Sequence, residues 1–239
     1  TIFDAQNSVD YGSNTGWVFV TPIYRNIYWI GGSGNWSDSA HWVDSNGVNC
    51  IPGPNDNVFF NQNSGFNSNS KTVTLDIDGF CHNITVENTV QAPTFTEPTA
   101  RKLNIFGSSV WQAGMILNLS TIAYQYNNED VTITSNGVVT GKVLPITDSG
   151  IGRVSFNKSK SVTFTDDFTS GGDIYLDNGT LNTNNKYVKI GSSLRSLSSS
   201  GSKTLNLGSS QVDVLGRNFD ASSIDIPENT SVLNMLYPG

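Results

Sequence analysis

Short runs of alternating apolar and polar residues recur along most of this chain, and each run is followed by Gly, Asn or Ser. Val131-Thr132-Ile133 precedes Asn136-Gly137, and Val188-Lys189-Ile190 precedes Gly191-Ser192-Ser193. An alternation of period two is typical of strands that bury one face. Gly and Asn accept the positive φ angles that tight corners require. The pattern therefore predicts an all-β protein whose strands are short and separated by polar corners.

The corners repeat as well as the strands. Residues 103–110 read LNIFGSSV and residues 205–212 read LNLGSSQV, and Asn-Gly pairs recur at Asn136 and Asn178. Irregular self-similarity of this kind is typical of stacked rungs, in which each rung buries its inward side chains against the next. We therefore predict a right-handed parallel β-helix. The alternative is a β-sandwich, which favours longer strands joined by hairpin loops.

Composition excludes several classes of protein. The 239 residues include 13 Lys and Arg against 20 Asp and Glu, for a net charge of -7, and only 14% of the chain is charged. Good helix formers such as Ala and Glu are scarce, so a helical bundle is excluded. Scattered basic residues on an acidic chain give no nucleic-acid surface. No apolar run approaches the length of a membrane span, so we expect no membrane insertion.

The first 72 residues differ from the rest of the chain. They contain four of the five tryptophans and the loop-rich stretches 31–35 and 51–56. An open end of a stack of strands needs a cover, because unpaired strands invite edge-to-edge association. We interpret this part as a tryptophan-rich cap at the N-terminal end of the stack.

Three of these tryptophans are the candidate ligand-binding residues: Trp29, Trp36 and Trp42. An exposed indole ring binds the apolar face of a sugar ring, so the three could form a carbohydrate-binding platform. The alternative is a hydrophobic plug, because three large rings in a short loop-rich segment make a small core of their own. The sequence leaves both interpretations open.

Aspartates cluster in the same loop-rich stretch. Asp38, Asp44 and Asp56 supply the hard oxygen ligands that Ca²⁺ prefers, although the spacing is not that of an EF-hand. The alternative is that these side chains stabilise loops as Asx-turns. We expect no cofactor other than this candidate calcium ion, bound weakly if at all.

Cys50 and Cys81 are the only cysteines. An even pair in a chain rich in Asn, Thr and Gly fits an oxidising compartment, and we predict a disulfide between them. The alternative is a pair of buried, reduced thiols.

An enzyme is the less favoured prediction. Asp166 and Asp167 are adjacent carboxylates, but no His, Arg or Lys group accompanies them as in polysaccharide hydrolases. Arg153 and Lys158 are basic residues with no partner pattern of the kind that polysaccharide lyases show. We interpret the two aspartates as solvated turn residues whose replacement costs little stability, and we predict no catalytic residues.

Several segments, in this order, resemble the modules of very large, repetitive cell-surface adhesins of Bacteroidota. The resemblance covers residues 28–236 and divides the chain into the end of a preceding module (1–27), the tryptophan-rich cap (28–72) and the solenoid rungs (73–239). The C-terminal residues 231–239 depart from the usual pattern of these modules. The segments that carry the resemblance are Tyr28–Trp42, Cys50–Pro52, Asp56–Phe60, Cys81–Thr85, Asn178–Asn184 and Leu207–Ser210.

This resemblance implies an extracellular, surface-exposed structural and adhesive module of the gliding-motility type, exported by type-nine secretion. Its partners would be the neighbouring modules of the same chain and a surface or polysaccharide ligand. One alternative is a carbohydrate-binding module of a secreted protein. A polysaccharide-degrading β-helix is a third hypothesis, because parallel β-helices often carry such activities.

Overall fold

The computed structural model describes residues 3–5, 17–19, 23–142, 152–198, 201–216 and 218–237. The one helix among them is a short 3₁₀ turn, η1 (Ser39–His41), so the predicted all-β class is confirmed. The strands are β1 (Phe3–Ala5), β2 (Trp17–Phe19), β3 (Arg25–Trp29), β4 (Gly34–Asn35), β5 (Trp42–Asp44), β6 (Asp56–Phe60), β7 (Thr72–Thr74), β8 (Gly79–Cys81), β9 (Ile84–Val86), β10 (Thr94–Thr96), β11 (Lys102–Ile105), β12 (Ser109–Val110), β13 (Ile116–Leu117), β14 (Thr121–Tyr124), β15 (Val131–Thr134), β16 (Val139–Thr140), β17 (Arg153–Phe164), β18 (Phe168–Ser170), β19 (Asp173–Asn182), β20 (Val188–Ile190), β21 (Leu194–Arg195), β22 (Lys203–Asn206), β23 (Gln211–Val214) and β24 (Val232–Met235).

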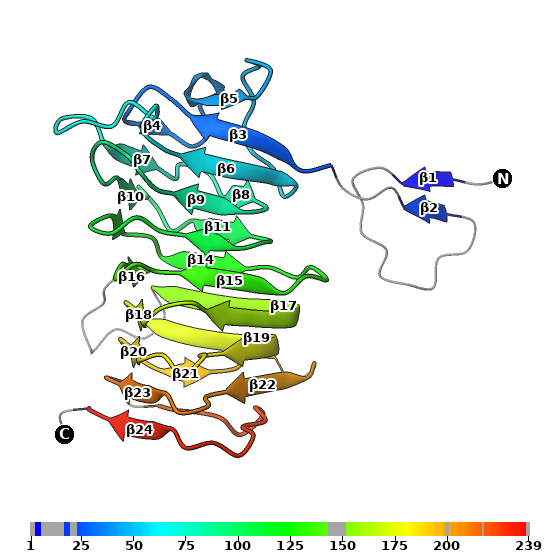
Figure 1. Ribbon diagram of the computed structural model, residues 1–239, viewed down its shortest axis with the longest axis vertical. Helices are drawn as coiled ribbons and strands as arrows, with labels where there is room; N and C mark the ends of the chain where they lie inside the picture. The colour runs from blue at the N-terminus through cyan, green and yellow to red at the C-terminus, as the bar shows by residue number, and fades with distance from the viewer. Residues whose placement is uncertain are drawn as a thin grey trace.

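Parallel pairing organises these strands into a curled sheet. In the largest sheet β8, β11, β14, β17 and β19 are hydrogen-bonded neighbours, and the chain returns repeatedly to the same strand position. Two smaller parallel sheets contain β13-β10-β7-β4 and β16-β18-β20-β23-β24. Figure 1 shows these strands stacked along the long axis, from β3 and β5 at one end to β24 at the other. Among the described strands, β3 and β5 form the one antiparallel pair.

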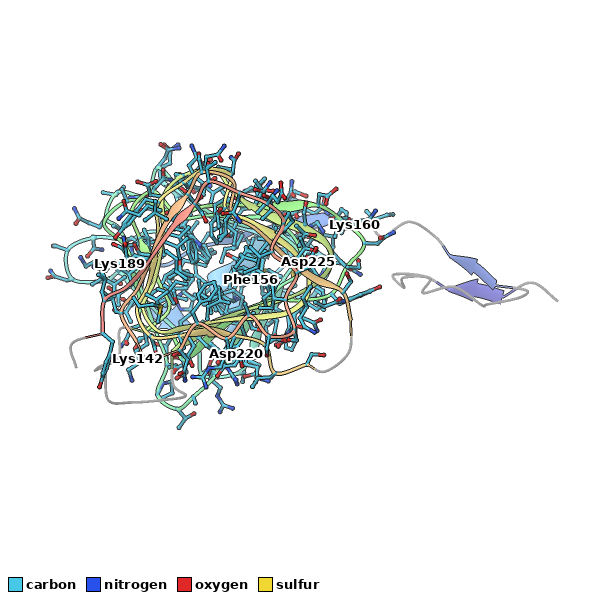
Figure 2. All side chains as sticks on the ribbon, turned by 90° about the horizontal axis from the view of Figure 1, so that it is seen from below. Lys142, Phe156, Lys160, Lys189, Asp220 and Asp225 are labelled. Atoms are coloured by element: carbon cyan, nitrogen blue, oxygen red, sulfur yellow. The ribbon has the colours of Figure 1, made fainter. Side chains whose placement is uncertain are left out.

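The core lies inside the curl of the sheet. Ile105, Tyr124, Phe156 and Leu176 are register partners on β11, β14, β17 and β19, and all four are buried. The Tyr124 and Phe156 rings stack with their centroids 5.4 Å apart. Figure 2 shows Phe156 in the middle and Lys160 and Lys189 on the outside. Each buried side chain of this size stabilises the fold by about 1.5–3 kcal/mol, so stability is distributed along the stack.

Most of the short alternating runs form strands, but residues 224–226 form only an isolated bridge between Asp225 and Thr204, and two of the predicted corners are wrong. Residues 154–156 and 162–164 each alternate as a separate short strand would, yet both belong to the single strand β17. Strand β19 runs through Asn178-Gly179, which was expected as a turn. Gly179 adopts φ +82° there, and its amide donates to the carbonyl of Ser202. The Asn-Gly signal therefore marks an irregularity within a strand pair, where the register between β17 and β19 shifts.

The two predicted segment boundaries, before residue 28 and before residue 73, fall inside strands. β3 begins at Arg25, before the boundary at residue 28, and β7 spans the boundary at residue 73. β3 and β6 pair with each other and β6 pairs with β9, so the tryptophan-rich cap is part of the same sheet. Of residues 1–22, the structure describes only the backbone of β1 and β2, which pair in parallel. That this segment ends a preceding module stays a prediction.

Candidate functional site

Parallel strands in register place equivalent side chains in rows on the outer face of the largest sheet. Leu103, Ile122, Val154 and Ile174 are register partners that point into the core. Because side chains alternate along a strand, the residues beside them form outward rows. One row is Lys102, Thr121, Arg153 and Asp173, and the next is Asn104, Ala123, Ser155 and Tyr175. We call this surface of β11, β14, β17 and β19 the polar face.

A small pocket of ≈ 200 Å³ lies on the polar face. We call it the polar-face pocket. Two of its residues, Lys102 and Arg153, are cations, and neither forms an ion pair with any residue that the structure describes. The pocket is lined by Lys102, Thr121, Ala123, Gln125, Arg153, Ser155 and Asp177.

Packing on the polar face holds Arg153 in place. Its guanidinium carbon lies 5.4 Å from the centroid of the Tyr175 ring, and the Arg195 guanidinium lies at the same distance from that ring. Arg195 forms an ion pair with Asp173 at 2.6 Å, whereas the Arg153 side chain, among the described residues, donates a hydrogen bond to the hydroxyl of Thr121 at 3.4 Å and has no carboxylate partner. Cation–π contacts of this kind hold a guanidinium in one orientation without neutralising its charge.

The neutral and acidic residues of the pocket are also held by hydrogen bonds. Gln125 Nε2 donates to Asn104 Oδ1 at 2.6 Å, and Asn104 Nδ2 donates to the carbonyl of Gly79. Asp177 accepts a hydrogen bond from the Leu197 amide at 2.8 Å and contacts the Ser155 hydroxyl at 3.5 Å. The pocket therefore combines two cations without ion-pair partners with amide, hydroxyl and carboxylate groups that hydrogen-bond to polar ligands.

A second group of titratable residues gathers at the corner that follows these strands. Tyr24 stacks on His82 with ring centroids 3.9 Å apart, and its hydroxyl donates to Glu129 Oε1 at 2.6 Å. His82 Nε2 lies 2.9 Å from Glu129 Oε2. Lys158 is buried, and its ammonium donates to Asn127 Oδ1 and, at 2.5 Å, to the carbonyl of Phe106. We call Tyr24, His82, Asn127, Glu129 and Lys158 the corner cluster.

Burial shifts the pKa values in the corner cluster. Burial lowers the pKa of Lys158 to about 8, because the charged ammonium loses water, and Glu129 offsets only part of this effect. Burial also lowers the pKa of His82, while the nearby Glu129 acts in the opposite direction. Burial and the hydrogen bond to Glu129 raise the pKa of Tyr24 to about 12. Burial acts to raise the pKa of Glu129, but the bond from Tyr24 and the charge of His82 outweigh it, so that pKa is lowered.

The corner cluster ties distant segments together. Tyr24 precedes β3, while Glu129 follows β14 and Lys158 lies in the irregular stretch of β17. From the sequence, Lys158 is an isolated basic residue, and Tyr24 and Glu129 give no signal. No spacing along the chain signals this group, because the register of β11, β14 and β17 brings it together. Since Lys158 is enclosed, its position fits a structural contact better than proton transfer to a ligand.

The three candidate tryptophans do not form an exposed platform. Trp29, Trp36 and Trp42 have no exposed surface, so the sugar-stacking prediction is wrong and the hydrophobic plug is what the structure shows. Trp42 packs edge-on against both other indoles, with centroids 4.8 Å apart in each pair. Trp29 Nε1 donates to the carbonyl of Gly32 and Trp42 Nε1 to that of Trp36. Trp29 on β3 and Trp42 on β5 are register partners of the antiparallel pair, and Phe60 packs against both rings.

The three candidate calcium ligands are engaged separately. Asp38 accepts from the Ala40 amide at the start of η1, and Asp44 accepts from the amides of Asn46 and Val48. Asp56 is buried and forms a two-point ion pair with Arg25, with both distances 2.8 Å. No group of three His, Cys, Asp or Glu residues suited to a metal ion occurs within the described residues. Calcium binding stays a prediction.

The predicted disulfide is absent from the structure, where Cys50 and Cys81 are free thiols. Cys81 is fully buried on β8, and its Sγ lies 3.9 Å from the carbonyl oxygen of Asn104. Burial raises the pKa of Cys81, and also that of Cys50, so both thiols favour the neutral form. The even count of cysteines could not show that Cys81 points into the core.

The adjacent pair Asp166 and Asp167 lies at a corner, where Asp167 is exposed as expected and Asp166 is half-buried, but both side chains also form structural hydrogen bonds. Asp166 accepts hydrogen bonds from the amides of Ser135, at 2.7 Å, and Asn136. Asp167 accepts from the Tyr187 amide at 2.9 Å. Each carboxylate therefore connects its own corner to a neighbouring one. The expectation that replacing Asp166 costs little stability is revised upward for this reason.

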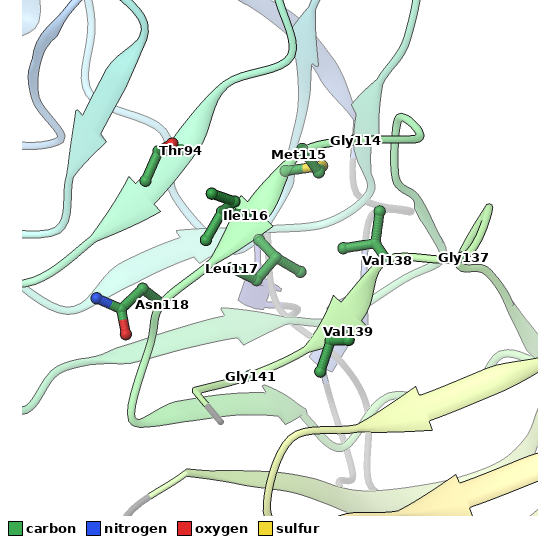
Figure 3. A pocket seen from close by; sticks show the side chains of 10 residues that line it. All are labelled: Thr94, Gly114, Met115, Ile116, Leu117, Asn118, Gly137, Val138, Val139 and Gly141. Carbon is green, nitrogen blue, oxygen red and sulfur yellow. The ribbon is translucent and has the colours of Figure 1, made fainter. Parts of the chain in front are cut away.

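A larger, apolar cavity of ≈ 630 Å³ lies between β13 and β16 (Figure 3). Met115, Ile116, Leu117, Val138 and Val139 line it, and Ile116 is 57% exposed. Gly141 at its rim leads directly into residues 143–151, which lie outside the described residues. Among the described residues that line the cavity, none has a titratable side chain, and Thr94 and Asn118 supply its polar side-chain groups.

Fold and site together define an all-β protein whose largest sheet carries a cationic pocket on its outer face. Comparison of the chain with protein-family models, with curated proteins and with solved structures found no match. Among the described residues, no helix has the length and apolar character needed to cross a bilayer.

Proposed function

We propose that this chain is a structural and adhesive module of a long extracellular surface protein, wound as a right-handed parallel β-helix. The observation that carries the proposal is the run of parallel pairings in which Leu103 pairs with Ile122, Ile122 with Val154, and Val154 with Ile174. Successive parallel returns of the chain fit stacked rungs, whereas β-sandwiches are built from antiparallel sheets. Stacked rungs make an elongated body suited to extending a surface protein away from the cell.

Carboxylates support the structural part of the proposal. Asp76 accepts from the amide of Ser37, Asp130 from that of Ser161, and Asp173 from that of Ser193. Each bond joins segments 20 or more residues apart. Groups used in this way reinforce the stack against shear. We therefore propose no enzymatic activity, although the cell surface, where we propose that the chain lies, also carries polysaccharides.

The sequence resemblance supports the cellular setting. It implies a module of a Bacteroidota adhesin of the gliding-motility type, exported by type-nine secretion, with neighbouring modules of the same chain as its partners. The corner cluster adds a physical argument. It anchors Tyr24, the residue just before β3, to Glu129. An anchored entry point keeps a preceding module in a defined orientation.

Adhesion under flow tests the proposal. Beads coated with the folded chain are expected to be retained on glass and on polysaccharide-coated glass at shear that removes beads coated with an unrelated folded, acidic protein. Equal detachment of the two kinds of bead contradicts the adhesive function. Incubation with pectin, alginate and plant glucans is the companion measurement. Release of reducing ends or unsaturated sugars would support the β-helix enzyme instead.

A carbohydrate-binding module is the second candidate function. The observation that favours it is the polar-face pocket, because Lys102 and Arg153 carry charges without ion-pair partners in the described part of the chain. The buried tryptophans contribute nothing to this candidate. Measuring the binding of soluble polysaccharides in solution distinguishes a carbohydrate-binding module from adhesion through the whole surface.

A further inference from the structure

We propose that the polar-face pocket binds the anionic group of an acidic saccharide, a carboxylate or a sulfate ester, through Lys102 and Arg153. The chain has a net charge of -7, so its average field repels anions. Two cations without ion-pair partners in one pocket therefore form a local exception.

The cations on the polar face differ in whether a carboxylate neutralises them. Arg195, on the same face, is neutralised by Asp173. Arg153 shares the Tyr175 ring with Arg195 but has no carboxylate of its own. Lys102 is exposed, and only its backbone amide, not its ammonium, bonds to Asp78. Both charges are thus available to a ligand, and a guanidinium binds carboxylate or sulfate oxygens with two parallel hydrogen bonds.

The floor of the pocket is fixed before any ligand arrives. Thr121 and Ala123 are buried on β14, and β14 is paired with both β11 and β17. The Tyr175 ring and the Thr121 hydroxyl hold the Arg153 side chain. A preformed site spends less conformational entropy on binding, so a small contact area still gives useful affinity.

The other residues of the pocket favour a sugar over a bare anion. Gln125, Ser155 and Asp177 place amide, hydroxyl and carboxylate groups around the two cations. Such groups bind the hydroxyls of a sugar ring, and Asp177 repels a second anionic group. A volume of ≈ 200 Å³ is below the about 300–1,000 Å³ of sites for drug-sized ligands. The pocket therefore accommodates one charged sugar unit, with the rest of the polymer lying along the outside of the sheet.

This inference deepens the proposed adhesive function by naming its ligand class, and the two can fail separately. Beads that adhere equally well after the pocket is disabled leave the adhesive function intact and assign it to another surface. Soluble saccharide that binds the pocket while the beads do not adhere leaves the pocket assignment intact.

Calorimetric titration in calcium-free buffer tests the pocket with three soluble polymers: polygalacturonate, dextran sulfate and neutral dextran. The variants are Lys102→Gln, which changes an exposed side chain, and Arg153→Gln, with thermal unfolding as the check that both are folded. The matched control is Lys160→Gln, because Lys160 is exposed on the same strand β17 but lies outside the pocket (Figure 2).

We expect the chain to bind polygalacturonate or dextran sulfate. The affinity should weaken about tenfold in each pocket variant, because each loses one charge-assisted hydrogen bond, and should stay unchanged in Lys160→Gln. Which of the two acidic polymers binds identifies the carboxylate or the sulfate as the source of the anion. Binding should also weaken as salt rises. Three results overturn the proposal: no binding to either acidic polymer by folded protein, equal binding of neutral dextran, or an equal loss in Lys160→Gln.

Discussion

The two ends of the strand stack differ in how they are covered. At the N-terminal end, β5 pairs antiparallel with β3, and the rings of Trp29 on β3, Trp42 on β5 and Trp36 in the segment between them have no exposed surface. At the C-terminal end, β24 pairs only with β23 among the described strands. Its apolar side chains Val232, Leu233 and Met235 are 41–56% exposed. One end is a closed aromatic core and the other is an open strand edge.

Hydrogen bonds show the same contrast. Near the closed end, side chains join segments far apart in the chain, as in the pairs Arg25 with Asp56 and Asp76 with Ser37. In residues 220–231 the side-chain hydrogen bonds are local, as between Asp220 and Ser222, although the backbone amides of Asp225 and Thr230 still donate to the distant carbonyls of Lys203 and Gly208. Local opening needs the least free energy where few buried contacts and long-range bonds hold a segment. We therefore expect the strand stack to resist unfolding at its N-terminal end and to fray at its C-terminal end.

The largest expected effect is at the aromatic core. Trp42→Ala removes the ring that contacts Trp29, Trp36 and Phe60, and we expect it to lower the free energy of unfolding by about 3–5 kcal/mol. Met235→Ala, at the open end, is the matched comparison and should change it by about 0.5 kcal/mol or less, because that side chain is 45% exposed. Chemical denaturation followed by far-UV circular dichroism measures both, and equal losses would remove the distinction between the ends.

The corner cluster gives the next largest effect, because it joins Tyr24 at the closed end to Lys158 in the middle of the stack. The pKa of Lys158 is about 8 in the folded chain and returns to 10.5 on unfolding. The unfolded state therefore binds the proton more tightly between these values, so stability rises as the pH increases from 8 to 10.5, by up to roughly 3 kcal/mol. The raised pKa values of Cys81 and Cys50 oppose this rise above about pH 9, because the ordinary thiol value is 9.0, and the raised pKa of Tyr24 opposes it above pH 10.

Denaturation curves at pH 8, 9 and 10 test this expectation. Lys158→Met should abolish the rise in stability with pH, whereas Lys160→Met, which changes an exposed residue of the same strand, should preserve it. A rise that survives in Lys158→Met assigns the pH dependence to other groups.

These effects also show which features the sequence can predict. Alternation and Gly or Asn corners predict the all-β class, because strand periodicity is a local property. The cluster Trp29, Trp36 and Trp42 indicates an aromatic core only as one of two alternatives, since burial depends on the pairing of β5 with β3, which brings Trp42 against the other two rings. The corner cluster and the polar face are invisible in the sequence. Their residues meet only through strand register, and one irregular stretch in β17 shifts that register.

A smaller effect separates long-range from local carboxylate bonds. Asp76→Asn removes an acceptor for the amide and the hydroxyl of Ser37, so we expect a loss of about 1–3 kcal/mol. Asp220→Asn changes a carboxylate that bonds only two residues away, and the expected loss is below about 0.5 kcal/mol. The measurement is the same denaturation series. Equal losses in the free energy of unfolding would mean that the sequence separation of the hydrogen-bonded residues does not distinguish the two ends.

The smallest expected effect concerns calcium at the closed end. Asp38, Asp44 and Asp56 are each occupied by backbone amides or by Arg25, so we expect side-chain bonds rather than a metal ion to hold this end. Removing calcium with a chelator should then shift the Tm by less than about 2 °C, which corresponds to under about 1 kcal/mol for a chain of this size. Asp56→Asn supplies the control: it should lower the Tm through the lost ion pair with Arg25, and by the same amount with or without chelator. A chelator-induced shift above about 10 °C in the unaltered chain, absent in Asp56→Asn, would instead show that a bound ion holds the closed end together.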